Sequence, residues 1–137
     1  MITEDYVSFE TAKLLKEKGF NEICEMFYCK PHEGYLKNHK RDEWWNSDLR
    51  KDMTCTCPTL QMAMKWLREV HNIYIKAVRY PAKVKNSNNE YCKPWWPEIT
   101  MLKSLGETDE EFNLGNEYNT YEEACEAAIR YCLENLI

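Results

Sequence analysis

The chain has 137 residues, of which 44% are hydrophobic and 30% charged, and its formal net charge at pH 7 is −5. This composition is typical of a globular protein and excludes a disordered chain, and the length suits one domain spanning residues 1–137. No apolar run approaches the roughly 20 residues that a membrane-spanning helix needs, so we expect no membrane-embedded segment.

The first predicted helix runs from Phe9 to Lys18. Ser8 can accept hydrogen bonds from the first-turn amides, and Gly19 suits the left-handed position that follows a helix. The next segment, Ile23 to Lys30, is short and rich in β-forming residues, so we predict a strand there. The polar stretch from His32 to Thr54 is expected to be irregular.

The second predicted helix runs from Pro58 to His71, with the proline in its first turn, where no N–H partner is lost. Asn72 is expected to end this helix because asparagine tolerates a positive φ angle. The β-branched and aromatic residues from Ile73 to Tyr80 predict a strand directly after it.

A turn over residues 86–89 separates that strand from a predicted return strand over Tyr91 to Met101. Pro94 and Pro97 cannot donate hydrogen bonds to a neighbouring strand, so we expect this strand to lie at the edge of the sheet or to be broken. Residues 103–119 are expected to be irregular.

The third predicted helix begins after Thr120, which forms a capping-box pattern with Glu123, and its apolar stripe continues to Leu136. The resulting order is helix, strand, helix, strand, strand, helix. This order predicts an α+β fold, in which three helices pack on a small, mostly antiparallel sheet of about three strands.

The seven cysteines are expected to be free thiols. The N-terminus, Met1 to Asp5, is acidic and lacks the apolar core of a secretory signal, so we expect a reducing, cytoplasmic environment. An odd number of cysteines in such an environment argues against a disulfide framework.

Five side chains form the best candidate metal site, with zinc as its cofactor. Cys24, Cys29 and His32 lie close together in the sequence, and Cys55 and Cys57 follow after a polar loop. Zinc takes four thiolate or imidazole ligands in a tetrahedron, which two such clusters could supply. The spacing is irregular, however, and Cys24 and Cys29 would point to opposite faces of a regular strand. Buried structural thiols are the alternative.

The sequence contains no recognisable catalytic motif. With four glycines in the whole chain, neither of the glycine-rich phosphate-binding motifs can be written. A cysteine nucleophile would need a neighbouring base, and nothing in the sequence places His32, His39 or His71 beside a thiol. We therefore favour a non-enzymatic role.

Two tryptophan pairs lie among basic residues. Aromatic rings interleaved with cations can stack on bases and neutralise phosphates, and tryptophans also anchor protein interfaces. Alternatively, one ring of each pair joins the core. The candidate interaction surface consists of Trp44, Trp45, Lys83, Lys85, Lys93, Trp95 and Trp96.

The charge is unevenly distributed along the chain. Residues 1–103 contain 17 of the 18 basic residues and 14 of the 23 acidic ones, whereas residues 104–137 contain Arg130 and nine acidic residues. An acidic chain with a mildly basic front would need a local basic patch to bind nucleic acid.

Three blocks of the sequence resemble small uncharacterised proteins of phages, prophages and mobile elements of gut-type bacteria. The blocks lie near both ends and in the middle of the chain, and they run from Tyr6 to Lys13, from Trp66 to Ile73 and from Tyr118 to Ala124. The resemblance implies a bacterial, phage-associated accessory protein, and it implies no activity and no site residues.

These patterns together predict a protein-interaction module whose partner is another protein. Two alternatives stay open. One is nucleic-acid binding through the basic hairpin from Lys83 to Trp96, and the other is a domain stabilised by zinc.

Overall fold

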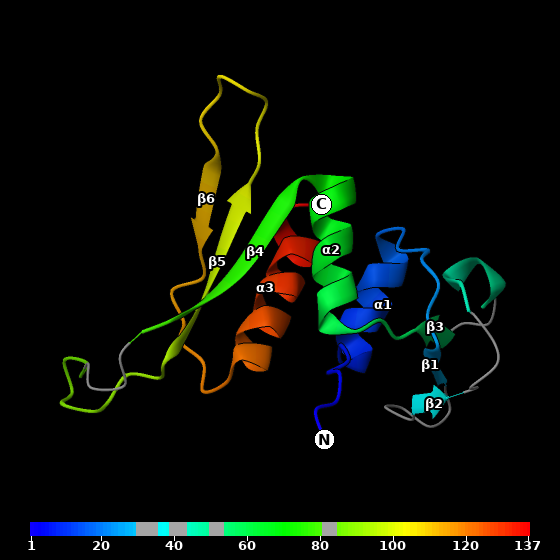
Figure 1. Cartoon of the computed structure of the whole chain (residues 1–137), viewed down its shortest axis with the longest axis horizontal. Coiled ribbons are helices and arrows are strands. Elements are labelled where there is room, and N and C mark those ends of the chain that lie inside the picture. Colours follow the sequence, from blue (N-terminus) through cyan, green and yellow to red (C-terminus); the bar gives the residue numbers. More distant parts are fainter. Residues whose placement is uncertain (30–35, 39–43, 50–53, 81–84) are drawn as a thin grey trace.

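The structure is a computed structural model that describes residues 1–29, 36–38, 44–49, 54–80 and 85–137. These residues form two three-stranded antiparallel sheets, with strand orders β2-β1-β3 and β4-β5-β6, and three α-helices (Figure 1). In chain order the elements are α1 (Phe9–Glu17), β1 (Met26–Cys29), β2 (Leu36–Asn38), the 3-10 helix η1 (Asn46–Asp48), β3 (Thr54–Thr56), α2 (Leu60–His71), β4 (Ile73–Arg79), β5 (Trp95–Met101), β6 (Glu110–Asn113) and α3 (Tyr121–Asn135).

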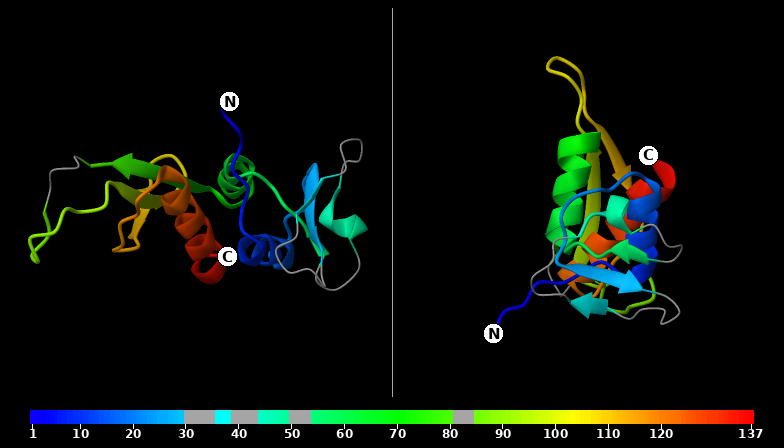
Figure 2. Two further views of the ribbon diagram at one scale, coloured as in Figure 1. Left: turned by 90° about the horizontal axis from the view of Figure 1, so that it is seen from below. Right: turned by 90° about the vertical axis from the view of Figure 1, so that its right-hand side faces the viewer.

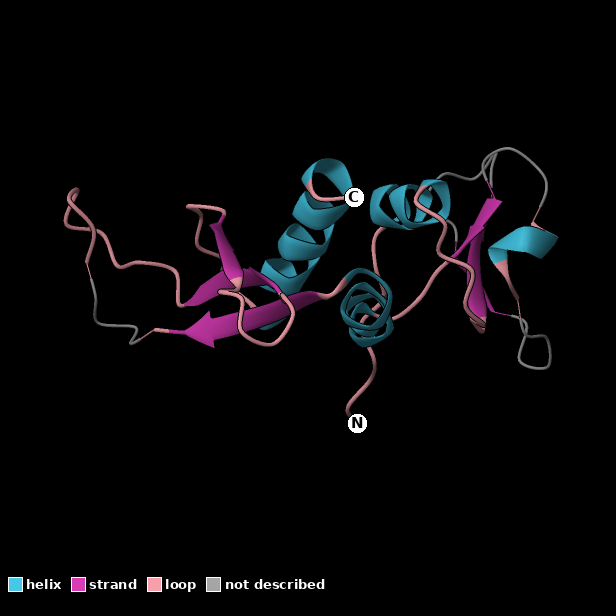
Figure 3. Cartoon of the chain, turned by 90° about the horizontal axis from the view of Figure 1, so that it is seen from above, coloured by secondary structure: helices cyan, strands magenta, loops and turns pink. Residues whose placement is uncertain are grey.

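The three α-helices lie between the two sheets (Figures 2 and 3). α3 packs against β4 and β5, α2 packs against β4, and α1 contacts both α3 and β3. One cluster of buried side chains runs through these layers, with Leu15, Leu67, Ile99 and Ile129 among its fully buried members. The α+β class and the three-stranded antiparallel sheet are confirmed. Within the described ranges, no helix has the length and apolar character needed to cross a membrane.

The ends of α1 and α3 follow the capping residues predicted from the sequence. The Ser8 hydroxyl accepts a hydrogen bond from the Thr11 N–H at 3.3 Å, and the Thr120 hydroxyl accepts one from the Glu123 N–H at 3.1 Å. The second half of the predicted capping box is wrong. The Glu123 carboxylate accepts from the N–H of Asn119, at 3.3 Å, and so binds one residue before the cap.

α2 begins two residues later than predicted. Its N-cap is Thr59, whose hydroxyl accepts a hydrogen bond from the Met62 N–H at 3.1 Å, so Pro58 precedes the helix and does not occupy its first turn. The predicted end is confirmed, because Asn72 has a φ angle of 57° and a left-handed conformation. This turn directs the chain straight into β4.

The sheet β2-β1-β3 is not predicted by the sequence. Its central strand β1 lies inside the predicted strand from Ile23 to Lys30, but β2 and the start of β3 fall in the stretch from His32 to Thr54 that the sequence predicts to be irregular. A buried amide holds this part of the chain. Asn46 donates from Nδ2 to the Phe20 carbonyl at 2.6 Å and accepts at Oδ1 from the Thr56 N–H at 2.8 Å.

Of the two alternatives predicted for the proline-bearing strand, the edge position is wrong, because β5 is the central strand of its sheet, whereas the predicted run from Tyr91 is interrupted at Pro94, and β5 begins at Trp95. Its neighbour β6 lies in the stretch that the sequence predicts to be irregular. Pro97 is tolerated because it lies between two places where β5 pairs with the chain on its β6 side. Glu98 pairs with Asn113, and Trp95 pairs with Tyr118, so Pro97 itself has no paired residue on that side. The missing N–H therefore breaks no hydrogen bond of the β5–β6 pair.

Candidate functional site

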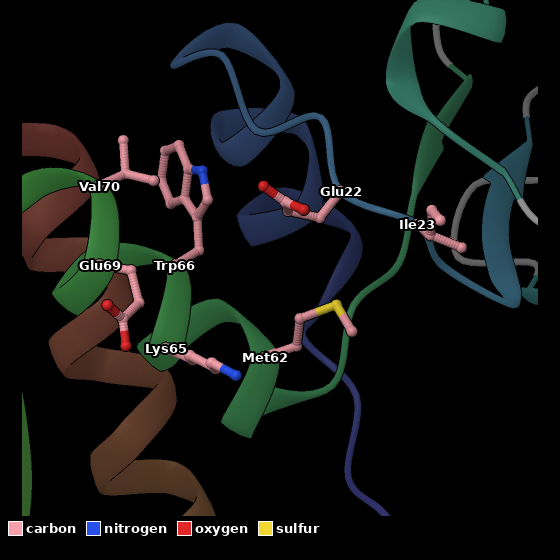
Figure 4. Close-up of a pocket in the computed structure, with 7 residues that line it drawn as sticks. All are labelled: Glu22, Ile23, Met62, Lys65, Trp66, Glu69 and Val70. Carbon is pink, nitrogen blue, oxygen red and sulfur yellow. The ribbon is translucent and has the colours of Figure 1, made fainter.

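A shallow hollow of about 320 Å³ lies between α2 and the segment that connects α1 to β1 (Figure 4). Five of the lining residues come from α2, where spacings of three and four residues place them on one face of the helix. The complete lining is Glu22, Ile23, Met62, Lys65, Trp66, Glu69 and Val70.

A second hollow of about 420 Å³ shares Ile23 and Met62 with the first and continues past the N-terminal end of α2. It is lined in addition by residues of the N-terminal segment, of the start of the β1 region and of the α2 entry: Glu4, Tyr6, Cys24, Glu25, Cys57, Pro58, Thr59 and Gln61. We call the two hollows together the α2 groove.

The floor of the α2 groove is apolar and accessible. Met62, Trp66 and Val70 follow one another at intervals of four residues and so form a stripe along α2. Met62 is 38% exposed, Val70 is 54% exposed, and Ile23 on the facing segment is 40% exposed. Trp66 is held rigidly below them, because its ring packs edge-on against Phe20 with 5.4 Å between the centroids. Apolar side chains gathered in this way are typical of interaction sites.

The rim of the α2 groove is acidic. Four carboxylates and one ammonium group line it, from Glu4, Glu22, Glu25 and Glu69 against Lys65. Glu69 also lies 3.8 Å from the exposed Arg68. Burial raises the pKa of Tyr6 inside the groove, and the nearby carboxylates of Glu25 and Glu4 raise it further. The groove therefore attracts cations, with an apolar floor beneath the charges.

The candidate metal ligands are placed mainly in the core. Cys24, Cys55 and Cys57 are buried, Cys29 is half-buried, and His32 lies outside the described residues. In the part of the chain that the structure describes, no three His, Cys, Asp or Glu side chains are grouped so that they could hold a metal ion. The zinc site stays a prediction.

Burial holds the core thiols in their protonated form. It raises the pKa of Cys24 and Cys55 to about 11 each and that of Cys57 to about 12. The Cys57 thiol donates a hydrogen bond to the Val7 carbonyl at 3.5 Å. Because the thiolate is the reactive and metal-binding species, these residues act as small apolar side chains in the core. All seven cysteines are free, as predicted.

The two tryptophans of β5 point to opposite faces of the sheet. Trp95 packs edge-on against Tyr121 of α3 at 5.5 Å, whereas Trp96 packs against Tyr80 on the other face at 5.3 Å. One ring therefore joins the helix-covered side and the other faces outward, as the alternation along a strand requires. In the first pair, Trp44 packs on Phe27 at 5.1 Å and Trp45 is half-buried.

The chain between β4 and β5 extends away from the helices (Figure 1). We call its described residues, 79–80 and 85–96, the hairpin arm. Two of its cations lie over its own aromatic rings, Arg79 at 5.4 Å from Trp95 and Lys85 at 4.9 Å from Tyr91. Lys93 is exposed, and Lys83 lies outside the described residues. The predicted turn is confirmed by side-chain hydrogen bonds from the Asn88 and Glu90 N–H groups to Asn86 Oδ1.

The sequence prediction misses the α2 groove. The candidate interaction surface that the sequence predicts contains no residue of α2. The missed signal is the stripe of Met62, Trp66 and Val70, which repeats every four residues beside charged neighbours. The facing residue Ile23 could not be found in this way, because only the tertiary structure brings it to α2.

Comparisons of the chain with protein-family models, with curated proteins and with solved structures gave no match.

Proposed function

We propose that the protein is a non-enzymatic interaction module and that its α2 groove binds a basic, partly apolar segment of a protein. The observation that carries this proposal is the combination of an accessible apolar floor with a rim of four carboxylates and one ammonium group. Apolar side chains of the partner would gain by leaving water, and its cations would lie against the carboxylates. The protonated core thiols support a role without catalysis.

The shape of the groove favours a segment that presents one apolar stripe. The floor residues Met62, Trp66 and Val70 lie along the axis of α2, so an amphipathic helix or an extended strand could follow them. Most of the affinity is expected from the apolar contacts, and the acidic rim would select against acidic partners and raise the association rate.

A synthetic peptide with leucines on one helical face and lysines on the other tests the proposal. Its binding is followed by isothermal titration calorimetry, with a peptide of leucine and glutamate as the matched probe. We expect the lysine peptide to bind, the glutamate peptide not to bind, and added salt to weaken the binding.

Variants of the groove identify the binding site. Met62→Glu and Val70→Glu introduce charges into the floor and should weaken peptide binding by about tenfold or more. Leu105→Glu is the matched control, because Leu105 is a fully exposed apolar residue in the β5–β6 connection and does not line the groove. Equal affinity of all three variants and the wild type would rule out the groove as the site.

Nucleic-acid binding through the hairpin arm is a second candidate, supported by the cation–aromatic pairs Arg79–Trp95 and Lys85–Tyr91. Fluorescence anisotropy with a labelled single-stranded oligonucleotide tests it. Binding should fall steeply with added salt and should be lost in a Lys85→Glu/Lys93→Glu variant. Absence of binding at low salt would exclude this function.

A phage or mobile-element role in the bacterial cytoplasm is also part of the proposal, and it rests on the sequence resemblance and on the free thiols. The neighbouring genes in bacterial genomes test it. Phage structural or integrase genes next to this gene would support the role, and conserved housekeeping neighbours would contradict it.

A further inference from the structure

We infer that the hairpin arm of one copy of this chain binds the α2 groove of a second copy, so that the protein associates head to tail. The inference rests on the proposed function, since it takes the α2 groove as a site for a basic, partly apolar segment. It adds that the chain itself carries such a segment, at a position from which it can reach another molecule.

The charges of the two surfaces are complementary. The arm presents the exposed cations Arg79, Lys85 and Lys93 against one carboxylate, that of Glu90. The groove presents four carboxylates against the single ammonium group of Lys65. Opposite potentials of this kind steer two molecules together and disfavour contacts between like surfaces, such as arm to arm or groove to groove.

The apolar parts of the two surfaces also match. Tyr91 is 65% exposed and Tyr80 is 41% exposed, so the arm offers aromatic rings that Lys85 and Trp96 of the same arm cover only in part. The groove offers Ile23, Met62 and Val70 as an uncovered floor. Tyrosines and arginines are the side chains that most often anchor protein interfaces, and here they stand next to each other on a projecting hairpin.

The geometry directs the contact to another molecule. The arm projects from the far end of β4 and β5, away from α2, whereas the α2 groove opens beside the segment that leads into β1 (Figures 1 and 4). Two different surfaces therefore meet, and after the first contact the pair keeps one free groove, on the molecule that gave its arm, and one free arm, on the other. Such a heterologous interface builds rings when the rotation closes and open chains when it does not.

Mixing two defective variants tests this arrangement. Met62→Glu disables the groove, and Lys85→Glu/Lys93→Glu disables the arm. Sedimentation velocity should show that the wild type associates in a concentration-dependent and salt-sensitive way. Either variant alone should associate with an affinity reduced by about tenfold or more. An equimolar mixture of the two variants retains one intact arm and one intact groove, so it should form dimers and nothing larger.

Two control variants exclude general effects of charge. Leu105→Glu adds a negative charge outside the groove, and Lys103→Glu reverses a charge at the start of the same β5–β6 connection, where the Lys103 ammonium group lies 3.7 Å from the Glu110 carboxylate. Both should associate like the wild type. Far-UV circular dichroism of every variant checks that the fold is intact, and a groove variant that has lost its fold is replaced by Val70→Glu.

The outcomes separate the inference from the proposed function. A wild type that stays monomeric at all concentrations but binds the leucine–lysine peptide would overturn the inference and leave the proposed function standing. A monomeric wild type that also ignores the peptide would overturn both. Failure of the mixture to form dimers would overturn the head-to-tail contact. A wild type that stays monomeric and binds a single-stranded oligonucleotide, while the Lys85→Glu/Lys93→Glu variant does not bind it, would overturn the inference and assign the arm to nucleic acid.

Discussion

The carboxylate of Glu126 should be one of the most important polar groups for the stability of the fold. Its Oε1 atom accepts hydrogen bonds from the Ser8 N–H at 2.9 Å, the Ser8 hydroxyl at 2.6 Å and the Thr11 hydroxyl at 2.6 Å. These contacts join α3 to the first turn of α1, which also has the positive end of its helix dipole there. The hydrogen bonds thereby link residues that lie 115 and 118 positions apart in the sequence.

The cost of Glu126→Ala can be worked from these three bonds. Thr11 is fully buried, so its hydroxyl would lose its acceptor inside the protein, at a cost of about 1–3 kcal/mol. The Ser8 groups can turn to water, and their lost bonds cost about 0.5–1.5 kcal/mol together. We therefore expect the free energy of unfolding to fall by about 1.5–4.5 kcal/mol. Glu126→Gln keeps an acceptor oxygen and loses the charge, so it should cost about 1 kcal/mol.

Urea unfolding at pH 7, followed by tryptophan fluorescence, measures these changes. Glu134→Ala is the matched control, because it makes the same replacement in α3 at an exposed residue that pairs with the exposed Arg130, at 3.2 Å. It should cost less than about 0.5 kcal/mol. If Glu126→Ala and Glu134→Ala destabilise the protein equally, the link between α1 and α3 does not stabilise the fold as we argue.

Three further predictions concern the backbone, pH and the thiols. Asn72→Ala should lower the free energy of unfolding by about 1 kcal/mol because the left-handed conformation disfavours a Cβ atom, and Asn72→Gly should be nearly neutral; thermal unfolding distinguishes the two. Burial lowers the pKa of His71 below its ordinary 6.5, so the unfolded chain binds the proton first, and stability should fall as the pH drops below 6.5. His71→Gln should weaken this dependence, which urea unfolding at several pH values measures. An unchanged slope of unfolding free energy against pH would contradict the prediction. The half-buried Cys29 and Cys92 should react with a thiol reagent in the folded protein, Cys92 slowly because burial and the carboxylate of Glu117 raise the pKa of its thiol. Five thiols should react only on unfolding, with or without a chelator: Cys24, Cys55, Cys57, Cys125 and Cys132. Protection that a chelator removes, together with about one zinc per chain in elemental analysis, would establish the predicted metal site instead.

The sequence predicts the features that depend on residues close together in the chain. Ser8 and Thr120 bind N–H groups three residues away, and Asn72 adopts a left-handed conformation that asparagine tolerates, so the starts of α1 and α3 and the end of α2 could be located without a structure. The long strands β4 and β5 carry enough β-branched and aromatic residues to be recognised. In β5 the two tryptophans lie on opposite faces, which agrees with the alternative in which one ring of the pair packs inward.

Only the tertiary structure decides the features that depend on distant partners. Strands of three or four residues, such as β2, β3 and β6, have too few residues for a pattern, and they form because neighbours supply hydrogen bonds. Lys16 shows how such a neighbour acts, since its ammonium group donates to the carbonyls of Leu49 and Thr54 at 2.6 Å each.

Three further features are decided in the same way. They are the position of Pro97 in a central strand, the carboxylate of Glu126 at the start of α1, and the facing of Ile23 and Met62 across the α2 groove. Each of them joins segments that are far apart in the sequence. The sequence by itself determined the local elements and their ends, because capping and strand formation depend on nearby residues. The packing of these elements determined the second sheet and the candidate binding site, because burial and charge there come from several segments at once.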